Sequence, residues 1–435
     1  MDQFFVSILL IGILFVILAS GLWIGLTLLA VGIISMELFM GKPAGDSMAL
    51  TVWGSLSSWT LTALPLFIWM GEILFRGRMS EDLFRGLAPW LNRLPGRLLH
   101  VNIIGSAIFA AVSGSSAATC ATVGKMTIPE LRRRGYPEKL IIGTLAGAAT
   151  LGFLIPPSII MIVYGVASNV SIAQLFIGGI LPGMLLASLF MGYVIIWSLF
   201  NGEKVPAAET DLSLWQKLSA ARHLIPLVLL ILLVLGSIYT GFATATEAAA
   251  LGVVGALSIS WVQKTMTWNS FKEGILAGAR LYCMIALILA GSSFLTLAMG
   301  FIGLPRNVAT WIGALSLSPL ELIAVLTLFY LLLGCFLDGI SMVVLTMTVV
   351  LPTIQQAGID LLWFGIFIVL VVEMAQITPP VGFNLFVLQG MTKHQIGFIA
   401  RTAFPLFLIM IAAVLLIYFI PEIVTYLPSQ MRGRG

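Results

Sequence analysis

The chain has 435 residues, of which 60% are hydrophobic and 9% charged, and its mean hydropathy is +1.09. Soluble domains carry about 25% charged residues, so this composition excludes a soluble globular protein and predicts an all-α membrane protein with many crossings. The net charge of +4 is small and spread over loops, which argues against a nucleic-acid partner.

The first half of the chain begins with long apolar stretches. Phe4–Met40 is nearly twice the roughly 20 residues that one crossing needs, with Gly21 and Gly25 near its middle, and it predicts two crossings. A third crossing is expected over Thr51–Phe75. The arginine-bearing stretch Arg76–Arg97 is predicted to lie at the membrane interface.

The next apolar segment, residues 101–131, is interrupted by Ser113-Gly114-Ser115-Ser116. This interruption leaves two arms of about 12 residues, each too short to cross a bilayer. We therefore predict a re-entrant helical hairpin whose tip lies at these four residues.

The apolar helix predicted over residues 140–167 contains a Pro156-Pro157 pair, which follows Gly152 closely. Two consecutive prolines remove two backbone donors and disfavour helical geometry in the residue before them, so the helix must unwind there. Unwound backbone inside a membrane is tolerated only where protein or a water-filled cavity surrounds it. A crossing over residues 173–200 completes the first half.

The second half repeats this order of elements. Crossings are predicted over residues 224–241, 246–262 and 281–301. A second re-entrant hairpin, residues 320–351, is interrupted at Asp338-Gly339-Ile340-Ser341. A second broken helix, residues 361–390, contains Thr378-Pro379-Pro380, and a last crossing spans residues 398–420.

The shared order predicts two inverted repeats, residues 1–210 and 211–435. A shift of 223 residues superimposes Pro156-Pro157 on Pro379-Pro380 and places Ser115 opposite Asp338. Because each half has an odd number of crossings, five, the halves face opposite ways. The positive-inside rule places the arginine-rich stretch of residues 76–97 in the cytoplasm, which puts the N-terminus on the periplasmic side.

Two matching interruptions of this kind are typical of a transporter's substrate and ion site. Helix ends there offer amides to an anion and carbonyl oxygens to a small hard cation such as sodium. Side-chain oxygens beside the breaks come from Ser113, Ser115, Ser116, Thr119, Ser341, Thr378 and Asn384. The alternative is that these groups bond only to their own or neighbouring helices.

Asp338 is the most informative single residue, because an acid near the middle of a membrane costs roughly 2.5–3.5 kcal/mol on insertion scales. It is expected to face a cavity as a cation ligand or proton site, or else to cap the helix that follows. Glu247 and Glu373 also lie in apolar runs, where structural and functional roles stay open. Lys125 and Arg280 are interpreted as interfacial side chains rather than ligands.

Enzymatic activity is not expected. A Gly-x-Ser-x-Gly elbow with an accompanying His and Asp is missing, which argues against an intramembrane hydrolase. Phosphate-loop motifs are missing too, which argues against ATP hydrolysis. The histidines, His100, His223 and His394, are predicted on solvated faces at the ends of crossings, without metal-ligand spacing.

At these residues the chain resembles the large membrane subunit (the M, or DctM-like, subunit) of tripartite ATP-independent periplasmic (TRAP) transporters. The resemblance is carried by motifs in order along nearly the whole length: residues 114–119 through Ile128-Pro129-Glu130, residues 154–158, Ala245-Thr246-Glu247-Ala248-Ala249-Ala250, and residues 377–386. Ala375-Gln376 departs from the glycine and aliphatic residue expected there.

The resemblance implies an ion-transporter-like fold of the elevator type, in which the hairpins and broken helices move against a scaffold of the other helices. It further implies sodium-coupled import of an organic acid, such as a C4-dicarboxylate, sialic acid or a related carboxylate, across the bacterial inner membrane. A soluble periplasmic binding protein would deliver the acid, and a small four-helix membrane subunit would brace the scaffold. No cofactor is needed besides the coupling ion.

The resemblance also assigns roles to the residues at the breaks. Sodium ligation falls on Ser113, Gly114, Ser115 and Ser116 with Gly152, Pro156 and Pro157, and on Gly339, Ser341, Thr378, Pro379 and Pro380. The substrate is assigned to Ser116, Thr119, Asp338 and Asn384. The alternatives are a stand-alone carboxylate or ion exchanger with the same plan and, from a different class, a membrane enzyme acting on lipids or peptides.

Overall fold

The computed structural model describes residues 3–40, 44–206, 212–315, 317–380 and 382–431. Within these ranges every regular element is a helix, which confirms the expected all-α fold. Val381, part of the second Pro-Pro motif, lies outside the described residues, as do the arginines at the C-terminal end of the chain.

The helices of the first half are α1 (Gln3–Ala19), α2 (Ile24–Met40), α3 (Ala44–Leu56), the 3-10 turn η1 (Trp59–Thr62), α4 (Ala63–Phe75), α5 (Met79–Leu91), α6 (Leu99–Ser113), α7 (Ser116–Arg133), α8 (Glu138–Ala149), α9 (Leu151–Leu154), α10 (Ile159–Ser168) and α11 (Ile172–Phe200).

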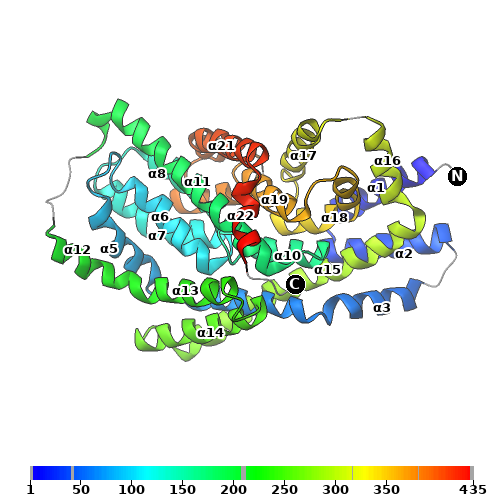
Figure 1. The fold of residues 1–435 in the computed structure, drawn as a ribbon, viewed down its shortest axis with the longest axis horizontal. Coiled ribbons are helices and arrows are strands. Elements are labelled where there is room, and N and C mark those ends of the chain that lie inside the picture. The colour runs from blue at the N-terminus through cyan, green and yellow to red at the C-terminus, as the bar shows by residue number, and fades with distance from the viewer. Residues whose placement is uncertain (1–2, 41–43, 207–211, 316, 381, 432–435) are drawn as a thin grey trace.

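The second half contains η2 (Gly202–Lys204), α12 (Leu214–Ala221), η3 (Arg222–Leu224), α13 (Ile225–Tyr239), α14 (Ala245–Val262), α15 (Trp268–Ile302), α16 (Leu304–Ala314), α17 (Pro319–Leu333), α18 (Gly339–Gln356), α19 (Leu361–Gln376), α20 (Phe383–Thr392), α21 (Ile396–Phe419) and α22 (Glu422–Gln430). Figure 1 shows an elongated body with α5 and α12 at one end and α1, α2 and α16 at the other.

Seven helical stretches of the described chain are long and apolar enough to cross a membrane, or eight if one bent pair counts as a span. The ten crossings predicted from the sequence include α1, α2 and the interrupted α19–α20, none of which is a continuous helix of 18 residues. Conversely α18, a predicted hairpin arm, has 18 residues and passes the length test. The re-entrant path of the second hairpin therefore stays a prediction.

The predicted third crossing is not one straight helix. α3 and the continuous stretch from η1 through α4 meet at 56°, because Ser58 between them adopts extended geometry, with φ −64° and ψ 125°. The helix that contains the predicted crossing over residues 281–301 is longer than that crossing. α15 begins earlier, at Trp268, where the side chain of Thr267 accepts a hydrogen bond from the amide of Ser270 at 3.1 Å.

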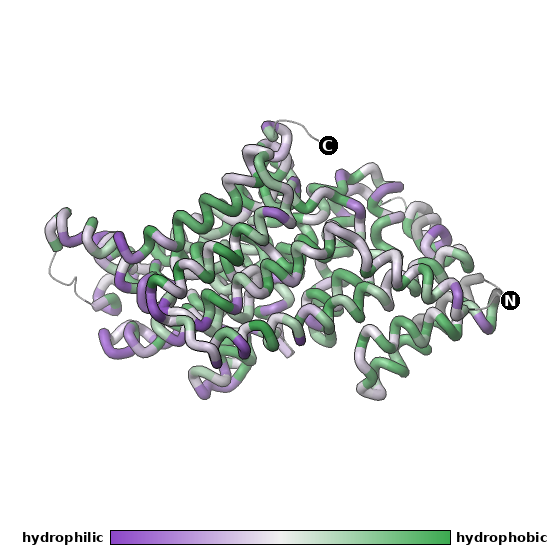
Figure 2. Tube along the Cα trace, turned by 90° about the horizontal axis from the view of Figure 1, so that it is seen from below, coloured by the Kyte–Doolittle hydropathy of each residue, from purple (hydrophilic) through white to green (hydrophobic). Residues whose placement is uncertain are grey.

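The surface of this body is rich in exposed apolar side chains, as a lipid-facing surface requires. Trp53, Trp215, Trp261 and Trp268 are each at least three-quarters exposed. Figure 2 shows hydrophobic residues along most of the helices and hydrophilic segments gathered at the ends, most densely at the end where α5 and α12 lie.

The first interrupted segment and the α19 part of the second lie inside the protein. The most apolar window of the stretch from α8 through α10 is 94% buried, against 17% for that of α12–α13. On α19, every residue from Trp363 to Gln376 is buried. Surrounding helices therefore provide the protein environment that unwound backbone needs at membrane depth around the first break, whereas Pro379 and Pro380 of the second break are exposed.

Helices at corresponding positions in the two halves exchange their packing partners. α4 packs on α14, and α15 packs on α2. In the same way α10 packs on α18, and α20 packs on α7. Two halves related by a two-fold axis would exchange contacts like this, and the inverted orientation of the halves stays a prediction.

Candidate functional site

The first hairpin tip is a short turn between α6 and α7. Gly114 has a left-handed conformation (φ +58°) that glycine adopts without steric cost, and α6 ends there. The next residue, Ser115, is extended, and its hydroxyl accepts a hydrogen bond from the amide of Ala118 at 3.4 Å. A left-handed glycine followed by a serine cap thus closes one helix and starts the next within two residues.

The first Pro-Pro break lies directly against this tip. α9 ends at Leu154 and α10 begins at Ile159, whose amide donates to the carbonyl of Gly114 at 3.3 Å. A Cβ atom on Gly152 would lie 2.6 Å from Cα of Ser116, and one on Gly114 would lie 2.8 Å from the carbonyl oxygen of Pro157. The structure thus brings the first predicted sodium set together through backbone contacts.

The hydroxyl groups of the first tip bond to one another. Ser113 Oγ lies 2.9 Å from Thr119 Oγ1, and Thr119 Oγ1 lies 2.8 Å from the carbonyl oxygen of Ser115. Thr119 has no exposed surface. This predicted substrate residue therefore lies inside the tip rather than on the wall of an open cavity.

The second hairpin tip is capped by an acid. Asp338 precedes α18, and its Oδ2 accepts hydrogen bonds from the amides of Ile340 at 3.1 Å and Ser341 at 3.2 Å. The hydroxyl of Ser341 also donates to Asp338 Oδ1. The capping role weighed for Asp338 is therefore present, and the side chain remains partly exposed.

The second break follows α19. Thr378 Oγ1 donates to the carbonyl of Met374 at 2.7 Å, and α20 begins at Phe383. A Cβ on Gly339 would lie 3.2 Å from Nε2 of Gln376, which brings this tip against the break of its own half. Both Pro-Pro bonds of the chain are cis.

The unexpected Ala375 is accommodated at the second break by a glycine on the facing helix. A Cβ on Gly334, just after α17, would lie 2.3 Å from Cβ of Ala375. The extra methyl group of Ala375 therefore fills space that Gly334 leaves free.

A buried polar cluster connects the two halves. Ser116 Oγ lies 2.9 Å from Glu373 Oε2 and accepts a hydrogen bond from Asn384 Nδ2 at 2.7 Å. The other oxygen of Glu373 accepts from the amide of Phe153 at 2.8 Å. The sequence left the role of Glu373 open, and the only signal was an acid in a long apolar run.

The predicted substrate residues fall in two places. Ser116 and Asn384 belong to the buried cluster, and Thr119 lies beside it in the first tip. Asp338 instead lines a separate cavity of about 1110 Å³, together with Ser341 and Arg280. The structure thus gathers the predicted residues at two tips rather than in one pocket.

The cavity at Asp338 lies between the second tip and scaffold helices. Apolar residues of α1, α2 and α15, such as Leu287, form most of its wall, together with Trp23 between α1 and α2 and Phe336 of the tip. Arg280, on α15, adds a guanidinium group, which binds carboxylates well. Sequence reasoning interpreted Arg280 as an interfacial side chain, and its exposed position leaves that interpretation a prediction. The cavity itself could not be predicted, because it is built from helices far apart in the chain.

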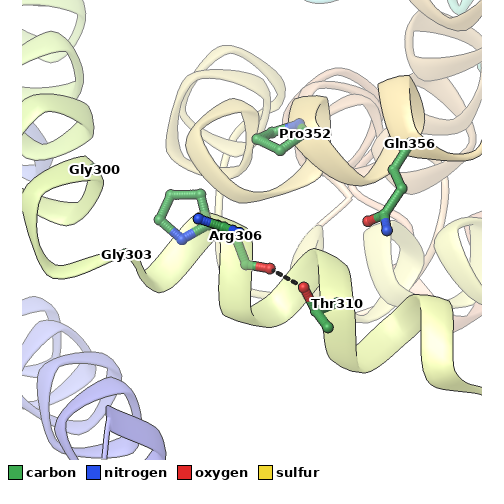
Figure 3. A pocket seen from close by; sticks show the side chains of 7 residues that line it. Gly300, Gly303, Arg306, Thr310, Pro352 and Gln356 are labelled. Atoms are coloured by element: carbon green, nitrogen blue, oxygen red, sulfur yellow. Dashed lines mark hydrogen bonds between the residues drawn. The ribbon is translucent and has the colours of Figure 1, made fainter.

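A second cavity, of about 540 Å³, lies where α15, α16 and α18 meet (Figure 3). Its lining residues are Gly300, Gly303, Pro305, Arg306, Thr310, Pro352 and Gln356. The hydroxyl of Thr310 donates to the backbone carbonyl of Arg306 at 2.8 Å. None of the predicted site residues lines this cavity.

Three other polar residues can now be placed. Glu247 is exposed and completes a capping box with Thr244 at the start of α14, which accounts for it structurally. Lys125 is exposed on α7. His100 corrects the expectation of a solvated face, since it is fully buried with a ring nitrogen 2.7 Å from the carbonyl oxygen of Pro95.

Comparisons with known proteins agree with this architecture. Residues 11–423 match the model of the DctM component of tripartite ATP-independent periplasmic transporters. The chain is 32% identical to the C4-dicarboxylate TRAP transporter large permease protein DctM of Pseudomonas aeruginosa, over 88% of this chain and 90% of that protein. It is 28% identical to the sialic acid TRAP transporter permease protein SiaT of Haemophilus influenzae, over 91% of this chain and 67% of that protein.

Among solved structures, the chain is similar to the YdaH transporter of Alcanivorax borkumensis. The TM-score is 0.63 with 14% sequence identity, and the match covers 98% of this chain and 99% of the other. At this identity the likeness concerns the fold alone.

Proposed function

Since the chain belongs to the DctM family, the large permease component of TRAP transporters, we propose that it imports an organic acid together with sodium ions. The observation that carries this proposal is the placement of both hairpin tips against the Pro-Pro breaks of their own halves. This arrangement concentrates free helix ends and backbone carbonyls at the two breaks, and transporters bind ions and substrate at breaks of this kind.

Sodium ions are proposed at each tip. The first set consists of the turn Ser113–Ser116 with the break Gly152–Pro157, and the second of Gly339, Ser341 and Thr378–Pro380. Close backbone approach supports the first set, because a Cβ on Gly152 would lie 2.7 Å from the carbonyl oxygen of Ser115. Oxygen atoms of this kind are the ligands that hard cations select.

The substrate is proposed to bind in the cavity beside the second tip. Arg280 supplies a cation for its carboxylate, whereas Asp338 on the same wall would repel it. A sodium ion next to Asp338 would remove this repulsion, so cation binding would favour anion binding at the neighbouring site. A C4-dicarboxylate or a sialic acid are candidate substrates, since the similar proteins are named for these acids.

The hairpins and broken helices are proposed to move together as the transport domain of an elevator. Among their helices, α6, α8, α10, α18 and α19 are largely buried, whereas α13 and α3 present broad apolar faces to the outside. Each net positive charge that enters the cell with the substrate releases about 2.3 kcal/mol of free energy per 100 mV of membrane potential. A dianion would therefore need more than two sodium ions for the voltage to drive its uptake.

The partners are proposed to be a periplasmic binding protein, which delivers the acid, and a small four-helix membrane subunit, which packs on the scaffold helices. The location is the bacterial inner membrane, with the N-terminus in the periplasm. This orientation keeps the basic end near α5 and α12 in the cytoplasm, in line with the positive-inside rule.

Uptake into proteoliposomes tests the proposal. We expect accumulation of a labelled C4-dicarboxylate or sialic acid only when a sodium gradient, the small subunit and the binding protein are all present. Sodium-driven uptake that needs no binding protein would instead support a stand-alone exchanger. Accumulation that is unchanged when potassium replaces sodium would contradict sodium coupling.

A further inference from the structure

The cavity where α15, α16 and α18 meet has no part in the proposed binding of substrate and sodium. Its volume is about 540 Å³, and ligand sites usually measure about 300–1,000 Å³. Two regions far apart in the chain, residues 300–310 and residues 352–356, form its walls. The fold therefore assembles a second space of the size of a small ligand, away from the two hairpin tips.

The cavity lies where two long apolar helices end. α15 is long and apolar enough to cross a membrane and ends at Ile302, and α18 passes the same test and ends at Gln356. Gly300 and Gly303 line the cavity from the end of α15, and Pro352 and Gln356 line it from the end of α18. The ends of such helices lie near the boundary between the hydrocarbon core and the lipid headgroups. We therefore expect the cavity at the level of the headgroups.

The charge of this cavity is positive. Among the described residues that line it, Arg306 on α16 is the only charged one. In the ranges that the structure describes, no carboxylate forms an ion pair with Arg306. A guanidinium group stays charged in proteins, and its planar fork matches two oxygen atoms of a phosphate group. The cavity therefore favours an anion of this geometry.

Two neutral side chains complete the polar part of the wall. Figure 3 shows the side chain of Gln356 projecting from α18 toward α16, and its Nε2 lies 3.5 Å from the position of a Cβ on Gly313. A glutamine amide offers two donor hydrogens, whereas Thr310 has donated its own hydrogen to the carbonyl of Arg306 at 2.8 Å and can only accept. The wall thus offers donors to a phosphate and an acceptor to a hydroxyl group beside it.

Exposed apolar side chains adjoin the cavity in the chain. Phe301 follows Gly300, and Trp311 follows Thr310, and both side chains are about half exposed. The other face of α16 holds the helix on the protein, since Leu304 is buried and Val308 packs against the core. Tryptophan is enriched at membrane interfaces, where one end of its ring system meets lipid. A ligand with acyl chains would cover these apolar surfaces, whereas a soluble anion would leave them bare.

The predicted orientation makes Arg306 unusual. Lys264 and Lys272 flank the start of α15 and are placed in the cytoplasm by the positive-inside rule, so the end of α15 lies on the periplasmic side. Basic residues are less frequent on that side. A lone arginine there, without an acidic partner among the described residues, is better explained by an external anion than by topology.

We propose that this cavity binds the headgroup of an anionic phospholipid, with Arg306 on its phosphate and Gln356 as a second donor. Basic pockets between membrane helices bind headgroups in this way. The lipid would connect α16 to α18, the second arm of the second hairpin, and so strengthen the contact between them. The inference does not depend on sodium coupling, on the substrate or on a binding protein.

Replacement of Arg306 tests the proposal. The probe is phosphatidylglycerol, added to the purified chain in detergent, and bound lipid is counted by native mass spectrometry. R306Q is expected to bind this lipid about tenfold more weakly, because a hydrogen bond to a charged group is lost. R306K keeps the charge without the planar fork and should fall between R306Q and the wild type. Binding by R306Q at the wild-type affinity would overturn the proposal.

R401Q is the matched control, because Arg401 is exposed on α21 and does not line this cavity. It should bind phosphatidylglycerol as the wild type does. If R401Q and R306Q lost the same affinity, the lipid would be responding to total charge rather than to this cavity, and the proposal would fail.

Thermal unfolding distinguishes a lipid from a soluble anion. Phosphatidylglycerol should raise the unfolding temperature of the wild type more than that of R306Q or Q356A, and more than phosphatidylcholine does, because choline neutralises its own phosphate. Glycerol phosphate and inorganic phosphate, which lack acyl chains, should have little effect. Stabilisation of the wild type by either soluble anion to the same extent would contradict a lipid site.

Uptake distinguishes a lipid from a protein partner. Unchanged lipid binding by R306Q, together with loss of the uptake that depends on an added binding protein, would identify Arg306 as part of a docking surface for that protein and overturn the lipid site. Weaker lipid binding by R306Q in the absence of any binding protein supports the proposal, whatever the chain transports.

Discussion

The two hairpin tips occupy corresponding positions but differ in their surroundings. The residue that caps the second arm is Ser115 in the first tip and Asp338 in the second. The first tip packs on a buried Pro156-Pro157 pair, whereas Pro379 and Pro380 are exposed and Asp338 faces the larger cavity. The comparison indicates that the second tip, the open tip, keeps a charge beside its cavity. The first tip, the closed tip, relies on hydroxyl groups and backbone contacts.

Removing the charge at the open tip should have the largest effect. Asp338→Ala is expected to abolish sodium-dependent uptake, because the proposed cation next to the substrate loses its counter-charge. The variant also loses a helix cap, worth about 1 kcal/mol. Asp338→Asn retains capping ability and should lose uptake as well. Uptake at the wild-type rate in either variant would remove Asp338 from the mechanism.

The control for this experiment is another capping acid of the same half. Asp360 is exposed and caps α19, accepting from the amide of Trp363 at 2.7 Å. Asp360→Ala should cost a similar stability, measured as thermal unfolding of the purified chain, and leave uptake near the wild-type rate. An equal loss of uptake would mean that helix capping alone explains the effect of Asp338→Ala.

The closed tip should be most sensitive to added volume. Gly152→Ala places a methyl group 2.6 Å from Cα of Ser116, and backbone there cannot move without shifting the tip. Overpacking of this kind costs about 1–3 kcal/mol, and uptake should fall at least tenfold. Thermal unfolding and proteoliposome uptake measure the two effects.

Gly192→Ala provides the contrast. This glycine lies inside α11 with no atom within 4 Å of an added Cβ, so alanine should raise stability by about 0.5–1 kcal/mol. If Gly152→Ala behaved like Gly192→Ala, the close approach of tip and break would not be essential for transport.

Local sequence features predicted the breaks but not the contacts between them. Pro-Pro pairs and the Ser113–Ser116 turn act on their own backbone, so their consequences are visible without the rest of the fold. Glu373 and Ser116 are far apart in the chain, and the pairing depends on how the halves pack. The cavity that Arg280 lines could not be predicted for the same reason, because it is formed by α1, α2, α15 and the second tip.

The link between the tips can be tested at Ser116. Ser116→Ala removes one hydroxyl and leaves the amide of Asn384 and the carboxyl of Glu373 without their shared partner. Such buried unpaired groups cost about 1–3 kcal/mol, which should appear as a lower unfolding temperature. Ser258→Ala is the control, since that hydroxyl is exposed and bonds only to the carbonyl of Val254 on its own helix. Equal stability of the two variants would show that the cluster does not hold the halves together.

The guanidinium group of Arg280, beside the second tip, should contribute to the affinity for the substrate. Arg280→Gln is expected to weaken the apparent affinity for the transported acid at least about tenfold, because a hydrogen bond to a charged group contributes about 1.5–3 kcal/mol. The concentration dependence of uptake measures this change. Arg401→Gln, at an exposed position on α21, should leave the affinity as it is. An unchanged affinity in Arg280→Gln would place the substrate elsewhere.

The smallest effect on stability and uptake is expected at Ser115, which corresponds to Asp338 in the first tip. Ser115→Ala removes a cap whose hydrogen bond to Ala118 is long, at 3.4 Å, so the cost should be at the lower end of the range for caps, about 0.5–1 kcal/mol. Sodium dependence of uptake should stay, because backbone carbonyls rather than this hydroxyl are proposed to hold the ion at the closed tip. If Ser115→Ala instead abolished uptake as completely as Asp338→Ala does, the side chains of both tips would bind ions in the same way. The contrast between a charged second tip and a backbone-lined first tip would then be wrong.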